Sequence, residues 1–139
     1  ALTTDIMVGF PGETEEEFAQ SVAFARQIGF SRAHVFAYSR RPGTVADKMP
    51  GQLSNAVKAQ RSRRMIDACA ASAAAYAAAY VGQTVEVLLE TPTGDGTVTG
   101  HTATYLTVHI TTDRPSGSLI SARITGADGD TLRGIEAET

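Results

Sequence analysis

Two short stretches of the chain combine residue types that are suited to binding a ligand. The first, VGFPGETEEEF at 8–18, joins a glycine–proline corner to a cluster of carboxylates. The second, YSRRPGT at 38–44, places two arginines before another proline–glycine turn. The first stretch is not a P-loop, because no Gly-Lys-Ser/Thr follows its glycines, and its glycine spacing does not match a dinucleotide-binding loop. Its acidic first helical turn would also repel a phosphate.

Metal and thiol chemistry are limited by a single cysteine, Cys69. One cysteine excludes an internal disulfide and any cysteine-rich metal site built from this chain alone. Its place on an apolar helix face is more typical of a small buried side chain than of a reactive thiol. We therefore expect no metal site within the chain.

Charge is divided unevenly along the 139 residues, although the net charge is only −3. Between Arg26 and Arg64 there are nine basic residues and one acidic residue, a local charge of +8. From Gly82 onward there are three basic and eight acidic residues, a local charge of −5. The basic segment is either a binding surface for a polyanion or a solvated, arginine-rich helix and loop.

The elements that position the two loops form a strand–helix–strand pattern. An apolar, β-branched run at 4–8 predicts a buried strand, and a second strand is expected around 34–38. Thr14 and Glu17 form a capping box that predicts a helix over 15–28. The two strands should therefore be parallel, with ligands at their carboxyl ends. The corner at 9–12 is either part of such a ligand site or only a turn between strand and helix.

A long helix and a β module follow. Ser54 is expected to cap a helix that runs to about Tyr80, with Ile66 and Cys69 on its apolar face and with Arg61 and Arg64 on another. After Gly82, β-branched runs alternate with turn residues, which predicts a small barrel or sandwich of about sixty residues. The expected fold is an α/β fragment at 1–52, a connecting helix at 53–81 and an all-β barrel at 82–139. One strand–helix–strand unit cannot bury its own sheet, so the first part is expected to be the end of a larger domain.

Several motifs resemble one enzyme family over nearly the whole chain. Three stretches resemble the C-terminal part of the radical-SAM tRNA methylthiotransferases and occur in the order found there: TTDIMVGFPGETEEEF, HVFAYSRRPGT and KMPGQL. GHTATYLTV resembles a motif of the TRAM domain that ends those enzymes. HVF-YS and MPGQ are most similar to the subgroup that acts on threonylcarbamoyladenosine next to the anticodon. Thr104 replaces the usual asparagine of the TRAM motif.

The resemblance implies a partial β/α barrel that binds S-adenosylmethionine at a 4Fe–4S cluster, with a second 4Fe–4S cluster in an N-terminal domain. It implies addition of a methylthio group to C2 of a modified adenosine in tRNA, in the cytoplasm and away from any membrane. The cysteine loop that binds the first cluster lies upstream in the family and is absent here, so this segment alone should bind no cluster and be inactive. The missing N-terminal and cluster-binding domains of the same protein are then implied partners.

Site residues follow from the same resemblance. The residues expected to border the cofactor are Asp5, Gly9, Gly12, Val35 and Phe36. Those expected to contact RNA are Arg40, Arg41, Arg61, Arg64, Tyr105 and Arg123, with His109 close to the last two.

Two other functions remain open from the sequence. The chain is alternatively a stand-alone RNA-binding module of TRAM type without catalysis, in which the strand–helix–strand part is only scaffold. A third possibility is an α/β protein whose glycine corner binds an unrelated small ligand.

Overall fold

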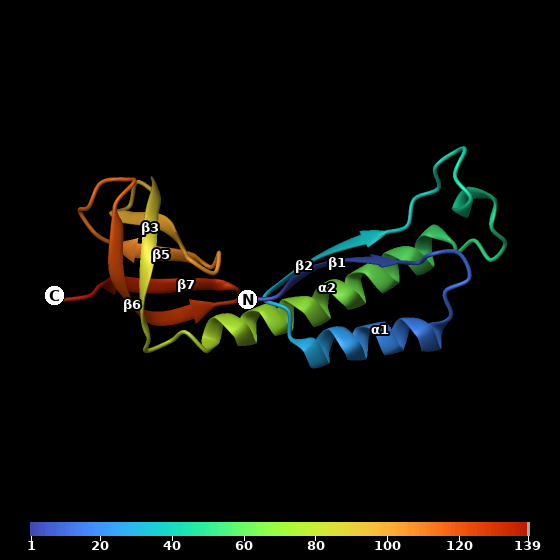
Figure 1. Ribbon diagram of the computed structural model, residues 1–139, viewed down its shortest axis with the longest axis horizontal. Helices are drawn as coiled ribbons and strands as arrows, with labels where there is room; N and C mark the ends of the chain where they lie inside the picture. Colours follow the sequence, from blue (N-terminus) through green and yellow to red (C-terminus); the bar gives the residue numbers. More distant parts are fainter. Residues whose placement is uncertain (139) are drawn as a thin grey trace. The chain divides into compact units, whose positions relative to one another are not determined.

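The computed structural model describes residues 1–138 and divides the chain into two compact units (Figure 1). One unit comprises Leu2–Ser72 and the other begins at Ala73. The boundary falls inside the long helix α2, Asn55–Ala78, so that helix contributes to both units. In the described part of the chain, no helix is both long and apolar enough to cross a membrane.

The first unit contains the expected strand–helix–strand pattern. Strand β1, Thr3–Val8, pairs in parallel with β2, Arg32–Ala37, and helix α1, Glu15–Ile28, connects them. The prediction of parallel strands is thus confirmed. The described residues form a two-stranded sheet, however, and the partial β/α barrel that we expected is not evident in them.

Local capping explains where the helices begin. The Thr14 side chain accepts a hydrogen bond from the Glu17 N–H, and the Glu17 carboxylate accepts one from the Thr14 N–H, which completes the predicted capping box. These bonds satisfy amides that have no partner within the helix. Ser54 caps α2 in a similar way, by accepting a hydrogen bond from the Val57 N–H.

The sheet has one face packed on helices and one face left open. Because strand side chains alternate, Val8 and its neighbours at every second position face the helices, where the core contains Phe18, Ala25 and Met65. The alternate positions are exposed. We call these residues the open face: Thr3, Asp5, Met7, Arg32, His34 and Phe36.

The second unit is a closed five-stranded barrel with the order β3-β4-β5-β7-β6. Its strands are β3, Thr84–Pro92; β4, Thr97–Thr102; β5, Thr107–Thr111; β6, Leu119–Asp128; and β7, Thr131–Glu136. All neighbouring pairs are antiparallel except β5 and β7, which are parallel. The prediction of a small all-β barrel is confirmed.

The last turn of α2 is part of this barrel's core. Ala77 is fully buried in the barrel cluster, and Tyr76 and Tyr80 pack against it. The hydroxyl oxygens of Tyr76 and Tyr80 lie 3.0 Å apart, and the Tyr80 hydroxyl lies 3.0 Å from Thr104 Oγ1. The Gly82 N–H then donates to the Ile124 carbonyl. This end of the helix is therefore fixed to the barrel by both apolar and polar contacts.

Candidate functional site

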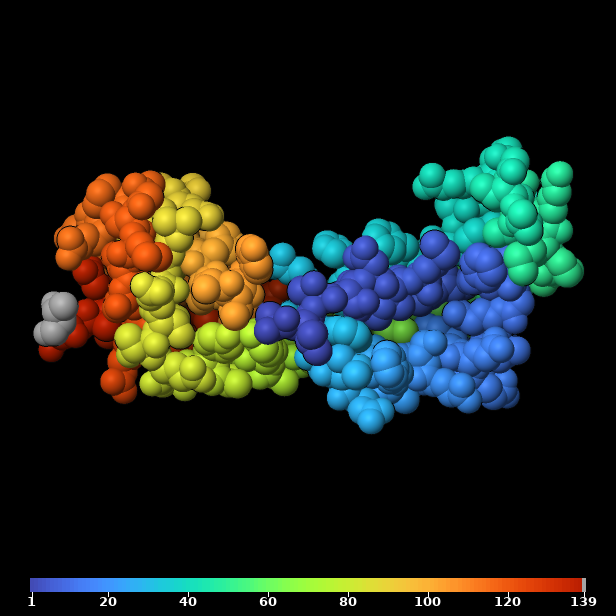
Figure 2. Space-filling view, viewed as in Figure 1, coloured from blue at the N-terminus to red at the C-terminus, as the bar shows by residue number. Residues whose placement is uncertain are grey.

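The carboxyl ends of β1 and β2 open onto a cavity in the first unit. Both strands end at the same edge of the sheet, and the loop at 39–51 extends beyond them (Figure 1). In the space-filling view this loop forms a lobe that rises above its own unit (Figure 2). The cavity has a volume of about 390 Å³, within the usual range of small-molecule sites. Its lining includes Met7, Phe36, Tyr38, Ser39, Arg41 and Thr44.

One wall of the cavity is apolar. Met7 and Phe36 are Cα partners across the two strands, and they are 54% and 50% exposed. Asp5 and His34 form the next pair on the same face of the sheet. Met7 and Phe36 thus line the cavity with apolar groups, and the Asp5 carboxylate lies beyond the lining on the same face of the sheet.

Val35 differs from the sequence-based expectation that it contacts the cofactor. It packs against the helix-side core together with Ile6 and Ala33. Neighbouring strand residues point to opposite faces, so Val35 and Phe36 do not face the same ligand. Met7 was not among the residues expected at the site. Its alternation with the buried Val8 and its pairing with Phe36 place it on the exposed face of the sheet.

The loop at 39–51 is braced by its own polar side chains. The Arg40 guanidinium donates from Nε to Asp47 Oδ1 at 3.0 Å and from Nη2 to the Asp47 carbonyl at 2.7 Å. The Thr44 hydroxyl donates to the Arg41 carbonyl at 2.8 Å and accepts from the Asp47 N–H at 3.2 Å. Gln52 donates to the carbonyls of Ala46 and Met49. These bonds connect the start of the loop to the short helix η1, Ala46–Lys48.

Arg40 and Arg41 are consequently in different situations. Arg40 is engaged with Asp47, whereas the Arg41 side chain makes no hydrogen bond or ion pair within residues 1–138. Arg41 is exposed and lines the cavity. Both arginines were predicted from the sequence to contact RNA. In the structure only Arg40 is paired with Asp47, and Arg41 lines the cavity.

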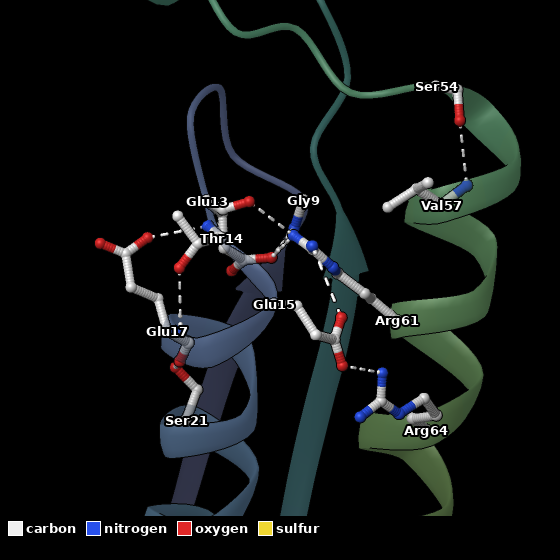
Figure 3. Close-up of polar contacts among 10 residues, drawn as sticks. All are labelled: Gly9, Glu13, Thr14, Glu15, Glu17, Ser21, Ser54, Val57, Arg61 and Arg64. Atoms are coloured by element: carbon white, nitrogen blue, oxygen red, sulfur yellow. Dashed lines mark hydrogen bonds and ion pairs between the residues drawn. The ribbon is translucent and has the colours of Figure 1, made fainter.

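The glycine–proline corner is held by a buried ion pair. The Glu13 carboxylate accepts the Gly9 N–H at 3.0 Å and the Arg61 guanidinium at 2.7 Å (Figure 3). Arg61 also donates to the Glu13 carbonyl at 2.9 Å and is only 5% exposed. The arginine thus connects α2 to the residue that fixes the corner.

A second, more exposed pair lies beside it. Arg64 donates to Glu15, and its guanidinium lies 4.8 Å from the centre of the Phe18 ring. Glu15 is also 3.6 Å from Arg61 (Figure 3). Arg61 and Arg64, which we expected to contact RNA, are thus both engaged in ion pairs within the first unit. The count of charges between Arg26 and Arg64 omitted Glu13 and Glu15, which compensate part of that charge.

The two corner glycines meet other parts of the first unit, and of the two only Gly9 lacks room for a side chain. Both have positive φ, 74° at Gly9 and 83° at Gly12. A Cβ on Gly9 would lie 2.5 Å from Lys58 Cγ. The Gly12 N–H donates to the Gly51 carbonyl at 2.9 Å. Within the described residues, the backbone at Gly9 therefore lies against α2 and that at Gly12 against the loop.

On the barrel, basic residues gather on the outer surface of β5, β7 and β6. His109 is the Cα partner of Arg133, and Arg123 is the partner of Ile135 two residues further along β7. The Arg133 guanidinium is paired with Asp128 at 2.8 Å. Arg123 and His109 thus lie on one face of the barrel, and Arg133 lies between them on β7.

Tyr105 lies apart from these residues, in the turn between β4 and β5. It is 75% exposed and has φ of 65°, which is unusual for a residue other than glycine. The residues before and after it, Thr104 and Leu106, each donate a backbone N–H to the Thr102 hydroxyl oxygen. The turn therefore presents an aromatic ring to solvent on a fixed backbone.

Neither iron–sulfur cluster implied by the resemblance fits the donors described here. Among residues 1–138, no group of three or more His, Cys, Asp or Glu side chains is arranged to hold a metal ion. Cys69 is buried in the core of the first unit, and burial raises the pKa of its thiol. A protonated, buried thiol is a poor metal ligand.

Comparison with known proteins gives a consistent set of relatives. No protein-family model matches the chain. A protein from a Thermoanaerobacter species, named tRNA-2-methylthio-N(6)-dimethylallyladenosine synthase, is 39% identical over 137 residues, covering 96% of this chain and 29% of the relative. A protein of the same name from Moorella thermoacetica is 39% identical, covering 96% of this chain and 31% of the relative. One from Mycobacterium bovis is 42% identical over 135 residues, covering 91% of this chain and 26% of the relative.

These names differ in one respect from the subgroup implied by the sequence motifs, since they refer to dimethylallyladenosine and not to threonylcarbamoyladenosine. The chain spans less than a third of the length of these relatives. Nearly all of this chain is therefore similar to one portion of enzymes named as tRNA methylthiotransferases.

Proposed function

We propose that the chain is the C-terminal part of a radical-SAM tRNA methylthiotransferase. The observation that carries this proposal is the similarity of 96% of the chain, at 39% identity, to 29% of a protein named tRNA-2-methylthio-N(6)-dimethylallyladenosine synthase. In this proposal the first unit completes a partial β/α barrel and supplies one edge of the S-adenosylmethionine pocket. The second unit is a TRAM-type barrel that binds tRNA in the cytoplasm.

The proposed substrate is a tRNA that carries dimethylallyladenosine. The three relatives described above share a name that contains this nucleoside, which favours it over threonylcarbamoyladenosine. The product would be the 2-methylthio derivative of that nucleoside.

The cofactor edge is assigned to the cavity at the strand ends. Bound S-adenosylmethionine would supply the methyl group and the radical chemistry of the reaction. Met7 and Phe36 offer an apolar surface for its adenine, and Asp5 lies two residues before Met7 on the same face, where its carboxylate would accept a hydrogen bond from a ribose hydroxyl. Gly9 and Gly12 shape the corner and are not assigned to the ligand. Because the described residues do not fit an iron–sulfur cluster, we assign no step to one.

Contacts with tRNA are assigned to groups of each unit, of which His109 is half-buried and the others are exposed. Arg41 and the barrel residues Arg123 and His109 would contact phosphates, and Tyr105 would stack on a base. Stacking of a base on an exposed aromatic ring contributes about 1–3 kcal/mol and tolerates any sequence. Five-stranded barrels of this size often bind oligonucleotides on one face. Arg61 is left out of this set because its guanidinium is buried against Glu13, and Arg64 is partly engaged with Glu15.

Replacing the apolar wall tests the cofactor assignment. In the full-length protein, the double variant Met7→Ala and Phe36→Ala should weaken S-adenosylmethionine binding roughly tenfold, because two half-exposed apolar contacts are lost. Phe24→Ala is the matched control, since Phe24 is 59% exposed on α1 and does not line this cavity. Affinity is measured by equilibrium dialysis, and 2-methylthio nucleosides in tRNA by mass spectrometry. Unchanged affinity in the double variant, or equal loss in the control, would contradict the assignment.

A stand-alone RNA-binding module remains the second candidate. It is favoured by the barrel's separate core and by the exposed ring of Tyr105. If a full-length protein produced no 2-methylthio nucleoside but bound tRNA in a manner that depended on Tyr105, this second function would replace the first.

A further inference from the structure

We infer that Arg41 is the anion-binding residue of the cavity, and that Arg40 and Asp47 are positioning residues that hold its loop in place. This inference rests on the proposed function and adds to it a division of roles between two adjacent arginines. The group bound by Arg41 is an oxyanion, either the carboxylate of S-adenosylmethionine or a phosphate of tRNA.

Arg40 and Arg41 differ in how available their guanidinium groups are to a ligand. Arg40 uses Nε and Nη2 on the carboxylate and carbonyl oxygens of Asp47, at 3.0 and 2.7 Å. Its positive charge is therefore compensated within the loop. Arg41 has no such partner among the described residues, and a guanidinium offers donors in a fixed planar arrangement that matches an oxyanion.

Arg41 also lies in the wall of the cavity. It lines the cavity together with Met7 and Phe36, the exposed apolar pair at the strand ends. Apolar walls lower the local polarity and so strengthen a charge-assisted hydrogen bond. A ligand with an apolar or planar body and an attached oxyanion would satisfy both the wall and the arginine.

Hydrogen bonds within the loop hold the backbone of Arg41. The Arg41 carbonyl accepts hydrogen bonds from the Thr44 N–H and from the Thr44 hydroxyl, and this hydroxyl accepts one from the Asp47 N–H. Asp47 is in turn held by Arg40. The backbone of Arg41 is thus connected through Thr44 and Asp47 to Arg40, which explains why two successive arginines serve different purposes.

The experiment is a double-mutant cycle in the full-length protein, with S-adenosylmethionine and tRNA as separate probes. Arg41→Ala should weaken binding of one probe about tenfold, because a charged hydrogen bond is lost. Arg40→Ala and Asp47→Ala should each weaken the same probe about threefold. In the Arg41→Ala background, Arg40→Ala should have no further effect, because a positioning residue acts only through the residue that it positions. Arg26→Ala, on the last turn of α1, is the matched control for loss of one exposed charge.

The two probes identify the source of the oxyanion. Weaker S-adenosylmethionine binding assigns Arg41 to the carboxylate. Weaker tRNA binding, with the salt slope reduced by about one unit, assigns it to a phosphate. Either result supports the inference. Unchanged binding of both probes in Arg41→Ala, or an Arg40→Ala effect that persists without Arg41, overturns it. If the wild-type protein binds neither probe, the proposed function fails, and this inference fails with it.

Discussion

Arg61 shows how strongly a single side chain can depend on a distant partner. Its guanidinium is almost fully buried, and it donates at 2.7 Å to the carboxylate of Glu13, 48 residues earlier in the chain. Loss of Arg61 would leave the Glu13 carboxylate, whose side chain is only 15% exposed, without its cation, and this costs more than the intact pair contributes. By contrast, Arg64 and Glu15 remain largely exposed, so water stabilises either charge when its partner is removed.

We predict that Arg61→Ala lowers the free energy of unfolding by about 3 kcal/mol, because it leaves Glu13 unpaired in a buried position. The control Arg64→Ala should lower it by less than about 1 kcal/mol, since exposed ion pairs contribute little. Chemical denaturation measures both. Equal effects of the two substitutions would show that burial of the Arg61–Glu13 pair has no energetic consequence.

Asp95, in the turn between β3 and β4, should make the barrel less stable as the pH becomes acidic. Hydrogen bonds from Thr93 and Thr97 lower the pKa of Asp95 from 3.8 to about 2. A carboxyl with a lowered native pKa stabilises the fold above pH 3.8, and this contribution is lost as the pH falls through 2. The stability difference between the wild type and Asp95→Ala should therefore be present at pH 6 and shrink toward pH 2, as measured by thermal unfolding.

Asp113→Ala is the control for Asp95, because within residues 1–138 the Asp113 side chain makes no hydrogen bond or ion pair. It should leave stability at pH 6 unchanged. A wild-type advantage over Asp95→Ala that stayed constant from pH 6 to pH 2 would contradict the role given to the Asp95 carboxylate.

At the scale of elements, the barrel depends on a close approach between β3 and β4. Gly100 in β4 is the Cα partner of Leu89, and a Cβ at Gly100 would lie 2.5 Å from the Leu88 carbonyl oxygen and 2.7 Å from Val87 Cγ1. Backbone cannot move aside without disturbing the strand pairing. The glycine is therefore required by space, and not by an unusual φ.

We predict that Gly100→Ala destabilises the barrel by about 1–3 kcal/mol, the usual cost of overfilling a packed interior. Gly126→Ala in β6 is the matched control, because the Cβ there would meet only the end of the flexible Arg133 side chain. Thermal unfolding of the two variants distinguishes them. The explanation would be wrong if Gly126→Ala were as destabilising as Gly100→Ala.

For the whole molecule, the division into units passes through α2 and not through a loop. Tyr76, Ala77 and Tyr80 pack on the barrel core, while Met65 and Cys69 of the same helix pack in the core of the first unit. One continuous helix therefore supplies residues to two separate cores. A barrel segment that begins at Gly82 would lack the residues at 76–80.

We predict that a segment of residues 73–139 is more stable than a segment of residues 82–139, by roughly 2–4 kcal/mol for the apolar surface that the helix end buries. Urea unfolding of the two segments measures this difference. As a control, Ala78→Ser in the longer segment alters an exposed helix position and should have little effect. Equal stability of the two segments would mean that the helix end does not stabilise the barrel.

Patterns that depend on near neighbours were determined by the sequence alone. The helix at 15–28 begins where Thr14 and Glu17 predicted, because a capping box is formed by residues three positions apart. Parallel strands followed from the spacing of two apolar runs around one helix. The barrel followed from β-branched runs separated by turn residues. Strands β4 and β5 are joined by a turn that contains Tyr105.

Only the tertiary structure decided which side chains are available at the site. Arg61 and Arg64 look alike in the sequence, yet burial against Glu13 separates them. Arg40 and Arg41 are adjacent, and only the fold of the loop brings Asp47 to one of them. Val35 and Phe36 are divided by the choice of sheet face, which depends on where the helices pack. In each case the deciding contact comes from a residue distant in the chain, or from an element that local sequence does not specify.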